Sequence, residues 1–115
     1  MTMSLPDLAA RLRSGELSAV DQVEGLAARV RPGDGFSHLA LEQAHDRARR
    51  LDAQVDRGRL HGLLLPVKDL VNVAGMPTTF GSAHRTRLAA ASDTLPDALL
   101  DAGAIIPGKS HTAEL

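Results

Sequence analysis

The chain is 115 residues long, 43% hydrophobic and 23% charged, with a formal net charge of −1 at pH 7, a composition typical of one compact globular domain. Its scattered charges exclude a basic nucleic-acid-binding stripe, and the absence of cysteine excludes disulfides, thiolate metal sites and a cysteine nucleophile. The longest apolar run, residues 63–67, is too short to span a membrane and the N-terminus lacks a signal core, so we expect a cytoplasmic protein.

The N-terminal part of the sequence predicts two helices. Leucines at i, i+3 and i+7 place the first helix after Ser4, its expected N-cap, and before Gly15, its expected stop. The second helix begins at Ser18, because Asp21 follows three residues later in the spacing of a capping box. Its expected apolar face consists of Val20, Val23, Leu26, Ala27 and Val30.

A short extended segment and a third helix follow. The segment 32–35 is rich in proline and glycine, and it separates the second helix from an extended stretch at residues 36–39. The third helix is predicted from Leu41 to Arg57, with Gly58 ending it. Its expected apolar stripe consists of Ala44, Ala48, Leu51 and Val55.

The second half of the sequence predicts a strand, a loop, a helix and another strand. The apolar run 62–67 fits a strand covered on both faces, and residues 71–81 have the composition of a loop. A helix capped by Ser92 or Asp93 follows and stops at Gly103, with Leu95, Leu99 and Ala102 on its apolar face. Residues 104–107 form the second strand. We therefore predict an α/β fold, with a βαβ unit whose strands are parallel and an N-terminal helical cap.

Lys68 directly follows the first predicted strand, and two interpretations of it are open. In one, its aliphatic stem packs while its ammonium reaches water or pairs with Asp69. In the other it is functional, because ligands bind at the carboxyl ends of strands in open α/β sheets. A lysine held out of water there has its charged form disfavoured and can act as a general base. Lys68 is the candidate catalytic residue of this sequence.

The block around Lys68 resembles the first conserved block of the amidase-signature family. A hydrophobic strand leads into Val67-Lys68-Asp69, followed by a Gly-x-Pro-Thr-Thr element and a Gly-Ser pair. The resemblance covers essentially the whole chain in motif order, through the segments 12–18, 44–52, 62–83, 92–93 and 102–115.

This resemblance implies amide C–N bond hydrolysis by a Ser–cis-Ser–Lys triad on a large mixed α/β sheet flanked by helices. The family's lysine, matched here by Lys68, deprotonates a bridging serine, which relays the proton from the nucleophilic serine. An acyl-enzyme forms, ammonia or an amine leaves, and water releases the acid. The resemblance implies a small-molecule amide substrate. We expect no cofactor and no metal, and the charge pattern and short apolar runs predict neither a nucleic acid nor a membrane as partner.

The sequence departs from the family pattern because it lacks the glycine- and serine-rich block that carries both serines. Its own serines stand outside such a block, and Ser82 within the Gly-Ser pair is expected only to shape the loop. These serines are Ser4, Ser14, Ser18, Ser37, Ser82, Ser92 and Ser110. Asp69, Thr78 and Thr79 could support Lys68 through hydrogen bonds or simply form a turn.

We therefore expect residues 1–115 to be the N-terminal part of a single, incomplete amidase domain that is inactive alone, with Lys68 facing water. The alternative is a non-catalytic module, or half of a split amidase or amidotransferase in which a second chain supplies the serine block.

A second motif competes with this interpretation. Residues 103–110 match the phosphate-binding pattern G-x-x-x-x-G-K-[ST], which makes a P-loop nucleotide-binding protein the third alternative. A P-loop needs a strand before its first glycine, whereas Gly103 ends a predicted helix and the bulky residues after it favour a strand. We expect Lys109 and Ser110 at the end of that strand. The histidines predict no metal site, since His38 and Glu42 lack further ligands.

Overall fold

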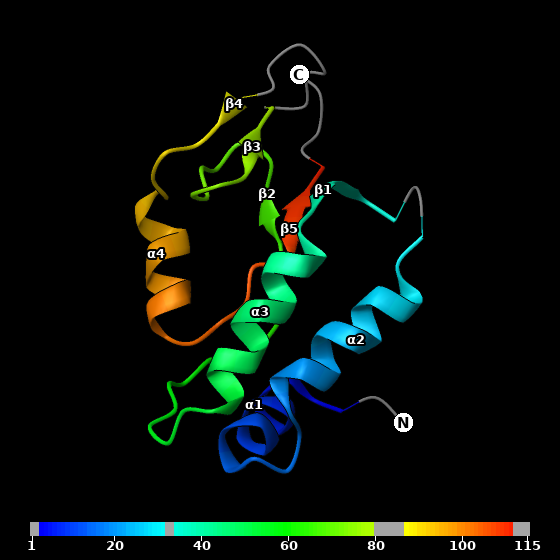
Figure 1. Ribbon diagram of the computed structural model, residues 1–115, viewed down its shortest axis with the longest axis vertical. Coiled ribbons are helices and arrows are strands. Elements are labelled where there is room, and N and C mark those ends of the chain that lie inside the picture. Colours follow the sequence, from blue (N-terminus) through cyan, green and yellow to red (C-terminus); the bar gives the residue numbers. More distant parts are fainter. Residues whose placement is uncertain (1–2, 32–33, 80–86, 112–115) are drawn as a thin grey trace.

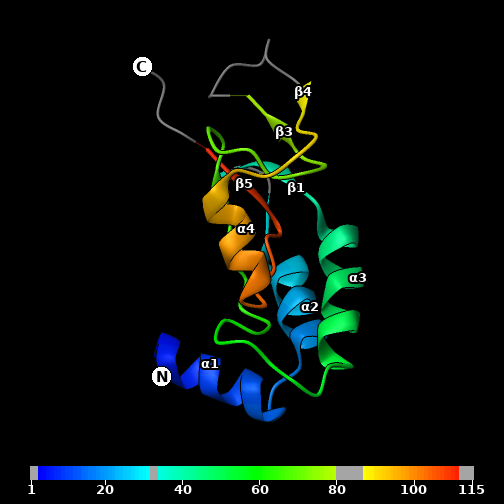
Figure 2. The same cartoon turned by 90° about the vertical axis from the view of Figure 1, so that its left-hand side faces the viewer.

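A computed structural model describes residues 3–31, 34–79 and 87–111 of the chain (Figure 1). The molecule is elongated, with extents of 43 × 30 × 23 Å. Its strands gather toward one end and its first helix lies at the other (Figures 1 and 2). The architecture is mixed α/β, as predicted, and none of the described helices is long and apolar enough to cross a membrane.

The first helix, α1 (Leu5–Ser14), begins and ends at the predicted signals. The side chain of Ser4 accepts a hydrogen bond from the backbone N–H of Asp7, which satisfies one of the free donors of the first turn. Gly15 ends the helix with φ 84°, a left-handed conformation that glycine adopts without strain. Leu12 is fully buried and packs in one cluster with Leu63, so α1 covers the start of the second half of the chain.

The second helix, α2 (Ala19–Arg29), has the predicted cap but a narrower buried face. Ser18 accepts a hydrogen bond from the backbone N–H of Asp21, at 3.0 Å. Val23 is buried, as predicted, whereas Ala27 is exposed. The difference arises because α2 packs mainly against one other helix, which covers a single stripe of its surface (Figure 1).

That partner is α3 (Leu41–Asp52), which is shorter than the helix predicted from Leu41 to Arg57. Its predicted stripe is buried up to Leu51, but Val55 is 94% exposed and lies beyond the end of the helix. The guanidinium of Arg57 folds back and donates to the carbonyl of Asp52, at 3.2 Å, and to that of Leu12, at 2.8 Å. The arginine satisfies a carbonyl at the end of α3 that another helical turn would have used, and joins it to α1.

A three-stranded sheet has the order β1-β5-β2, with the last of these strands in sequence at its centre (Figure 1). β5 (Gly108–Ser110) runs parallel to β2 (Val67–Lys68), which confirms the predicted parallel pair. It runs antiparallel to β1 (Phe36–Leu39), the predicted extended stretch, whose pairing the sequence did not reveal. The sheet is therefore mixed.

Both parallel strands begin later than the apolar runs that predicted them. The ladder of β2 and β5 starts at residues 67 and 109, and an isolated bridge between Leu64 and Ile105 precedes it. Pro66 and Pro107 stand between the bridge and the ladder, and proline has no N–H to donate to a ladder. Lys68 is consequently the last residue of β2 and not the residue after it.

The predicted loop 71–81 contains part of a second, two-stranded sheet. β3 (Pro77–Thr78) pairs antiparallel with β4 (Arg87–Leu88), strands too short to give an alternating pattern. The Gly81–Ser82 pair of the family-like block lies outside the described residues.

The fourth helix, α4 (Thr94–Asp101), lies on the opposite side of the sheet from α2 and α3 (Figures 1 and 2). Asp93 is its N-cap residue, as the sequence allowed. The predicted apolar face is wrong at Leu95, which is 61% exposed, while Pro96 is buried. The consecutive residues Ile105 and Ile106 belong to two different core clusters, so the approach to β5 contributes to the core on both sides of the sheet.

Candidate active site

Lys68 ends β2 and extends from its exposed face. Val67 beside it is buried, whereas Lys68 is exposed, as expected for neighbours along a strand. In the parallel ladder Lys68 is opposite Ser110, and Val67 is opposite Lys109. Side chains in register share a face, so Lys68 and Ser110 lie on one face of the sheet and Lys109 on the other. Lys68 therefore stands at the carboxyl edge of the parallel pair, where α/β proteins bind ligands.

The chain turns immediately after Lys68. The backbone N–H of Val71 donates to the carbonyl of Lys68, at 3.0 Å, which closes a four-residue turn. Within the turn, the N–H of Asp69 donates to the carbonyl of Ser110, at 2.9 Å, and continues the ladder with β5. The direction in which the backbone leaves Lys68 is thus fixed from two sides.

Asp69 points into the protein, away from Lys68. It is 1% exposed and accepts hydrogen bonds from the backbone N–H of Thr79, at 2.9 Å, and from the Thr79 hydroxyl. Burial by itself would raise the pKa of Asp69, but hydrogen bonds from Thr79 and Ser37 and the positive charge of Lys109 together lower it. The ion pair between Lys68 and Asp69 that the sequence allowed is absent from the described part of the chain.

Lys109 is the buried lysine of the site. It is 0% exposed, and its Nζ donates to the carbonyls of Val71 and Pro77 and to the hydroxyl of Thr78. Burial lowers its pKa, against the opposing effect of the negative charges of Asp69 and Asp93. The phosphate-binding pattern at residues 103–110 was the one signal that pointed to this residue, and it suggested the wrong chemistry.

The geometry excludes a P-loop at that pattern. Gly103 follows α4, and Gly108 and Lys109 lie in the central strand of the sheet. A Cβ on Gly108 would come 2.1 Å from the carbonyl oxygen of His38, so this glycine serves close strand packing. The ammonium of Lys109 is already enclosed by protein acceptors and has no open face for a phosphate.

Asn72 and Asp93 connect this cluster to α4. The carboxylate of Asp93 accepts from the backbone N–H of Asn72, at 2.9 Å, and the side-chain oxygen of Asn72 accepts from the Thr78 hydroxyl, at 2.9 Å. Ser92 accepts from the backbone N–H of Ala74, at 2.8 Å. Residues 92 and 93, predicted only as caps of α4, also hold the loop that follows Lys68.

The described residues around Lys68 form a supporting framework for its backbone. Three surface hollows of about 310, 440 and 230 Å³ lie beside β1 and α3, and Lys68 lines none of these three. No group of three or more potential metal ligands occurs in the described ranges. The site presents one exposed amine on a strand edge whose backbone is held by a buried lysine, a buried aspartate and two threonines.

Comparison with known proteins identifies the fold. The family model for amidases matches residues 21–115 of this chain. The chain belongs to the amidase family. It is 34% identical to an amidase from Pseudomonas putida, over 97% of this chain and 26% of that protein. It is also 34% identical to a glutamyl-tRNA(Gln) amidotransferase subunit from Thermobifida fusca, over 99% of this chain and 25% of that protein.

Solved amidase structures share the fold described above. The peptide amidase of Stenotrophomonas maltophilia superposes with a TM-score of 0.78 at 30% identity, over 94% of this chain and 24% of that one. A vestigial protein complex that bears on the origins of an s-triazine catabolic enzyme gives a TM-score of 0.85 at 29% identity, over 94% of this chain and 26% of that one. The chain spans about a quarter of the length of the curated amidases and amidotransferase subunits that it matches.

Proposed function

We propose that this chain contributes the lysine to an amide-hydrolysing active site, with Lys68 as the base of a Ser–cis-Ser–Lys triad. Membership of the amidase family supports amide hydrolysis as the chemistry. The observation that carries the assignment of Lys68 is its place at the carboxyl edge of a parallel strand pair, on a backbone held from both sides.

The serines of this triad come from polypeptide that residues 1–115 do not contain. A lysine amine acts as a base where burial disfavours its charged form. Lys68 is exposed in this chain, so the same additional polypeptide must also cover it. We therefore propose that residues 1–115 form the N-terminal part of one amidase domain and have no amidase activity alone.

Two sources of the serine block are compatible with the comparisons. The first is the same polypeptide, because the amidases similar to this chain are about four times as long. The second is a separate chain, since one similar protein is one subunit of an amidotransferase and another belongs to a protein complex. We favour the first, because β2, short and bonded to one neighbour among the described strands, leaves an edge that a longer sheet would cover.

The substrate class is an amide. The chain is equally similar, at 34% identity, to an amidase and to an amidotransferase subunit. Both a simple amide and the side-chain amide of glutamine are therefore substrates to test.

The decisive experiment compares ammonia release by the 115-residue chain and by a polypeptide that adds the serine block. We expect background rates for the chain alone, activity for the extended polypeptide, and a loss of about a thousandfold or more in kcat for Lys68→Met. Arg59→Met, which also removes an exposed cation, is the matched control and should change kcat by no more than about twofold. Turnover by the chain alone that Lys68→Ala abolishes, or full activity of the extended Lys68→Met variant, would overturn the proposal.

A further inference from the structure

The buried ammonium of Lys109 binds a single loop. A charged group is stable inside a protein only when it is paired and hydrogen-bonded. An ammonium has three donors, and here they meet the carbonyls of Val71 and Pro77, the latter at 3.3 Å, and the hydroxyl of Thr78, at 3.1 Å. All three acceptors belong to residues 71–78, the loop that follows Lys68 together with strand β3. The lysine therefore holds this loop against β5.

The acceptor at Val71 connects Lys109 to the backbone of Lys68. The N–H of Val71 closes the turn by donating to the carbonyl of Lys68, and the carbonyl of the same residue receives the ammonium of Lys109. Lys109 itself lies in register with Val67, the residue before Lys68. The ammonium thus holds the far end of the turn while the ladder holds the near end.

Lys109 acts from the opposite face of the sheet. Its side chain shares a face with buried Val67, whereas Lys68 is exposed on the other face with Ser110. The effect on Lys68 therefore passes through the backbone of the turn and not through contact between the two amines.

We propose that Lys109 is a positioning residue for Lys68, which by fixing the turn 68–71 sets the direction in which the Lys68 amine leaves the sheet. The catalytic consequence rests on the proposed function of Lys68, while the structural consequence does not. A small misplacement of a catalytic group has a large effect on rate, which gives the buried lysine its functional value.

The sequence makes a direct test possible, because Lys68 and Lys109 are the two lysines of the chain. Lysine labelled with ¹³C and ¹⁵N gives one set of side-chain NMR signals for each, and amide hydrogen exchange reports the Val71 N–H that closes the turn. Lys109→Met keeps the length of the side chain and removes the charge. We expect exchange at Val71 to accelerate by about tenfold or more relative to Ala48 in α3, and the Lys68 signals to shift.

Asp52→Ala is the matched control. It weakens the start of α2, far from the turn along the chain, so it lowers stability without touching the contacts of Lys109. We expect the ratio of exchange rates at Val71 and Ala48, and the Lys68 signals, to stay as in the wild type. Thr78→Val removes one acceptor of the ammonium and serves as the second test variant, with the same direction of change as Lys109→Met. Unchanged Val71 exchange and Lys68 signals in a folded Lys109→Met chain, or in Thr78→Val should Lys109→Met not fold, would disprove the positioning role.

Activity separates this inference from the proposed function. In the polypeptide extended by the serine block, Lys109→Met should lower kcat by about tenfold or more and leave KM nearly unchanged, because Lys109 does not reach the open face. If Lys68→Met stays active, the proposed function is wrong. Amide exchange at Val71 and the Lys68 signals then still test whether Lys109 positions Lys68. If Lys68→Met is inactive and Lys109→Met has the wild-type kcat, the catalytic part of the inference is wrong.

Discussion

His61 is a buried histidine whose environment opposes protonation. It is 1% exposed, and neither ring nitrogen has a hydrogen-bond partner among the described residues. Burial lowers the pKa of His61, and the positive charges of Arg57 and Arg47 lower it further, against the opposing effect of Asp52. The folded chain therefore holds this imidazole neutral under conditions in which the unfolded chain would protonate it.

We predict that His61 makes the chain less stable in acid. Between the lowered pKa of the folded state and the ordinary value of about 6.5, the unfolded state binds more protons. The free energy of unfolding should therefore be constant above about pH 6.5 and fall below it, with a contribution from this residue of up to about 1.4 kcal/mol per pH unit. Urea unfolding at a series of pH values should show a smaller slope for His61→Phe than for the wild type.

The control for this prediction is His111→Gln, which replaces an exposed histidine in place of the buried one. Part of the slope should persist in His61→Phe, because burial and then the charge of Lys109 also lower the pKa of His38. Equal slopes in His61→Phe and the wild type would contradict the prediction.

Among single residues, the sequence predicted those whose chemistry follows from near neighbours. Lys68 is a candidate because of the strand before it and the motif around it, and its catalytic role stays a prediction. The roles of Lys109 and His61 could not be predicted, because the groups that surround them come from distant parts of the chain. The acceptors of Lys109, for example, lie more than thirty residues before it. Asp69 illustrates both cases: its supporting role was considered, but its burial depends on Thr79 and Ser37.

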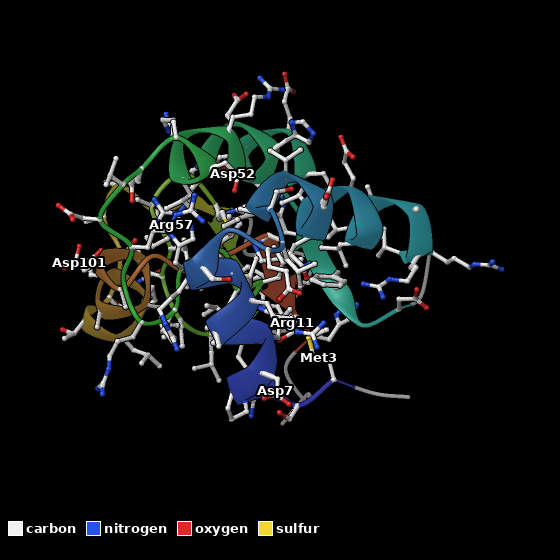
Figure 3. The ribbon with its side chains drawn as sticks, turned by 90° about the horizontal axis from the view of Figure 1, so that it is seen from below. Met3, Asp7, Arg11, Asp52, Arg57 and Asp101 are labelled. Carbon is white, nitrogen blue, oxygen red and sulfur yellow. The ribbon has the colours of Figure 1, made fainter. Side chains whose placement is uncertain are left out.

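At the scale of elements, the start of α2 depends on a residue of α3. Asp52, the last residue of α3, accepts hydrogen bonds from the backbone N–H groups of Ala19, at 2.7 Å, and Val20, at 3.0 Å. Figure 3 shows Asp52 at this junction, with Arg57 nearby. A carboxylate is well placed at a helix N-terminus, where free N–H groups and the helix dipole favour negative charge.

We predict that Asp52→Ala lowers the free energy of unfolding by about 1–2 kcal/mol, as the loss of a helix cap does. Asp46→Ala on the same helix removes a partner of an exposed ion pair with Arg49 and should change stability by less than about 0.5 kcal/mol. Urea denaturation of the two variants provides the comparison. If both substitutions lowered the free energy of unfolding equally, the hydrogen bonds from Asp52 to the start of α2 would add no stability beyond that of an exposed ion pair.

Element boundaries were predictable where a local signal sets them. Ser4, Gly15 and Ser18 cap their helices as expected because capping involves residues three or four apart. The end of α3 was wrong because it is set by Arg57, which bonds to the carbonyl of Leu12 as well as to α3. Likewise, strand β3 was missed because a two-residue strand is defined only by its partner.

At the scale of the whole molecule, β5 joins the N-terminal and C-terminal halves of the chain. Gly108 makes this possible, because a Cβ there would meet the carbonyl oxygen of His38 at 2.1 Å. We predict that Gly108→Ala separates β1 from β5 and lowers the free energy of unfolding by about 1–3 kcal/mol. Gly25→Ala, in the open interior of α2, should instead raise it by about 0.5–1 kcal/mol.

Urea unfolding measures both effects, and amide exchange along β1 locates the first. Rapid exchange of the His38–Leu39 amides in Gly108→Ala, with α2 and α3 protected as before, is the expected pattern. Wild-type stability of Gly108→Ala would mean that β1 and β5 tolerate a wider separation than the structure implies. The α/β class and the family could be predicted from the sequence. The pairing of β1 with β5 could not, because an antiparallel pair between strands far apart in the chain leaves no local pattern in the sequence.

The central position of β5 has a consequence for how the protein is made. Ribosomes release a chain from its N-terminus, so β1 and β2 emerge before the strand that each of them pairs with. Until residues 108–110 have been synthesised, both strands keep unpaired edges. The helical pair α2 and α3 can form early because its contacts are local, whereas the sheet must wait. The sheet is therefore the part of the fold that is exposed to misfolding during synthesis. Translation speed and chaperone binding before residues 108–110 emerge should influence the yield of folded protein through the sheet more than through the helices.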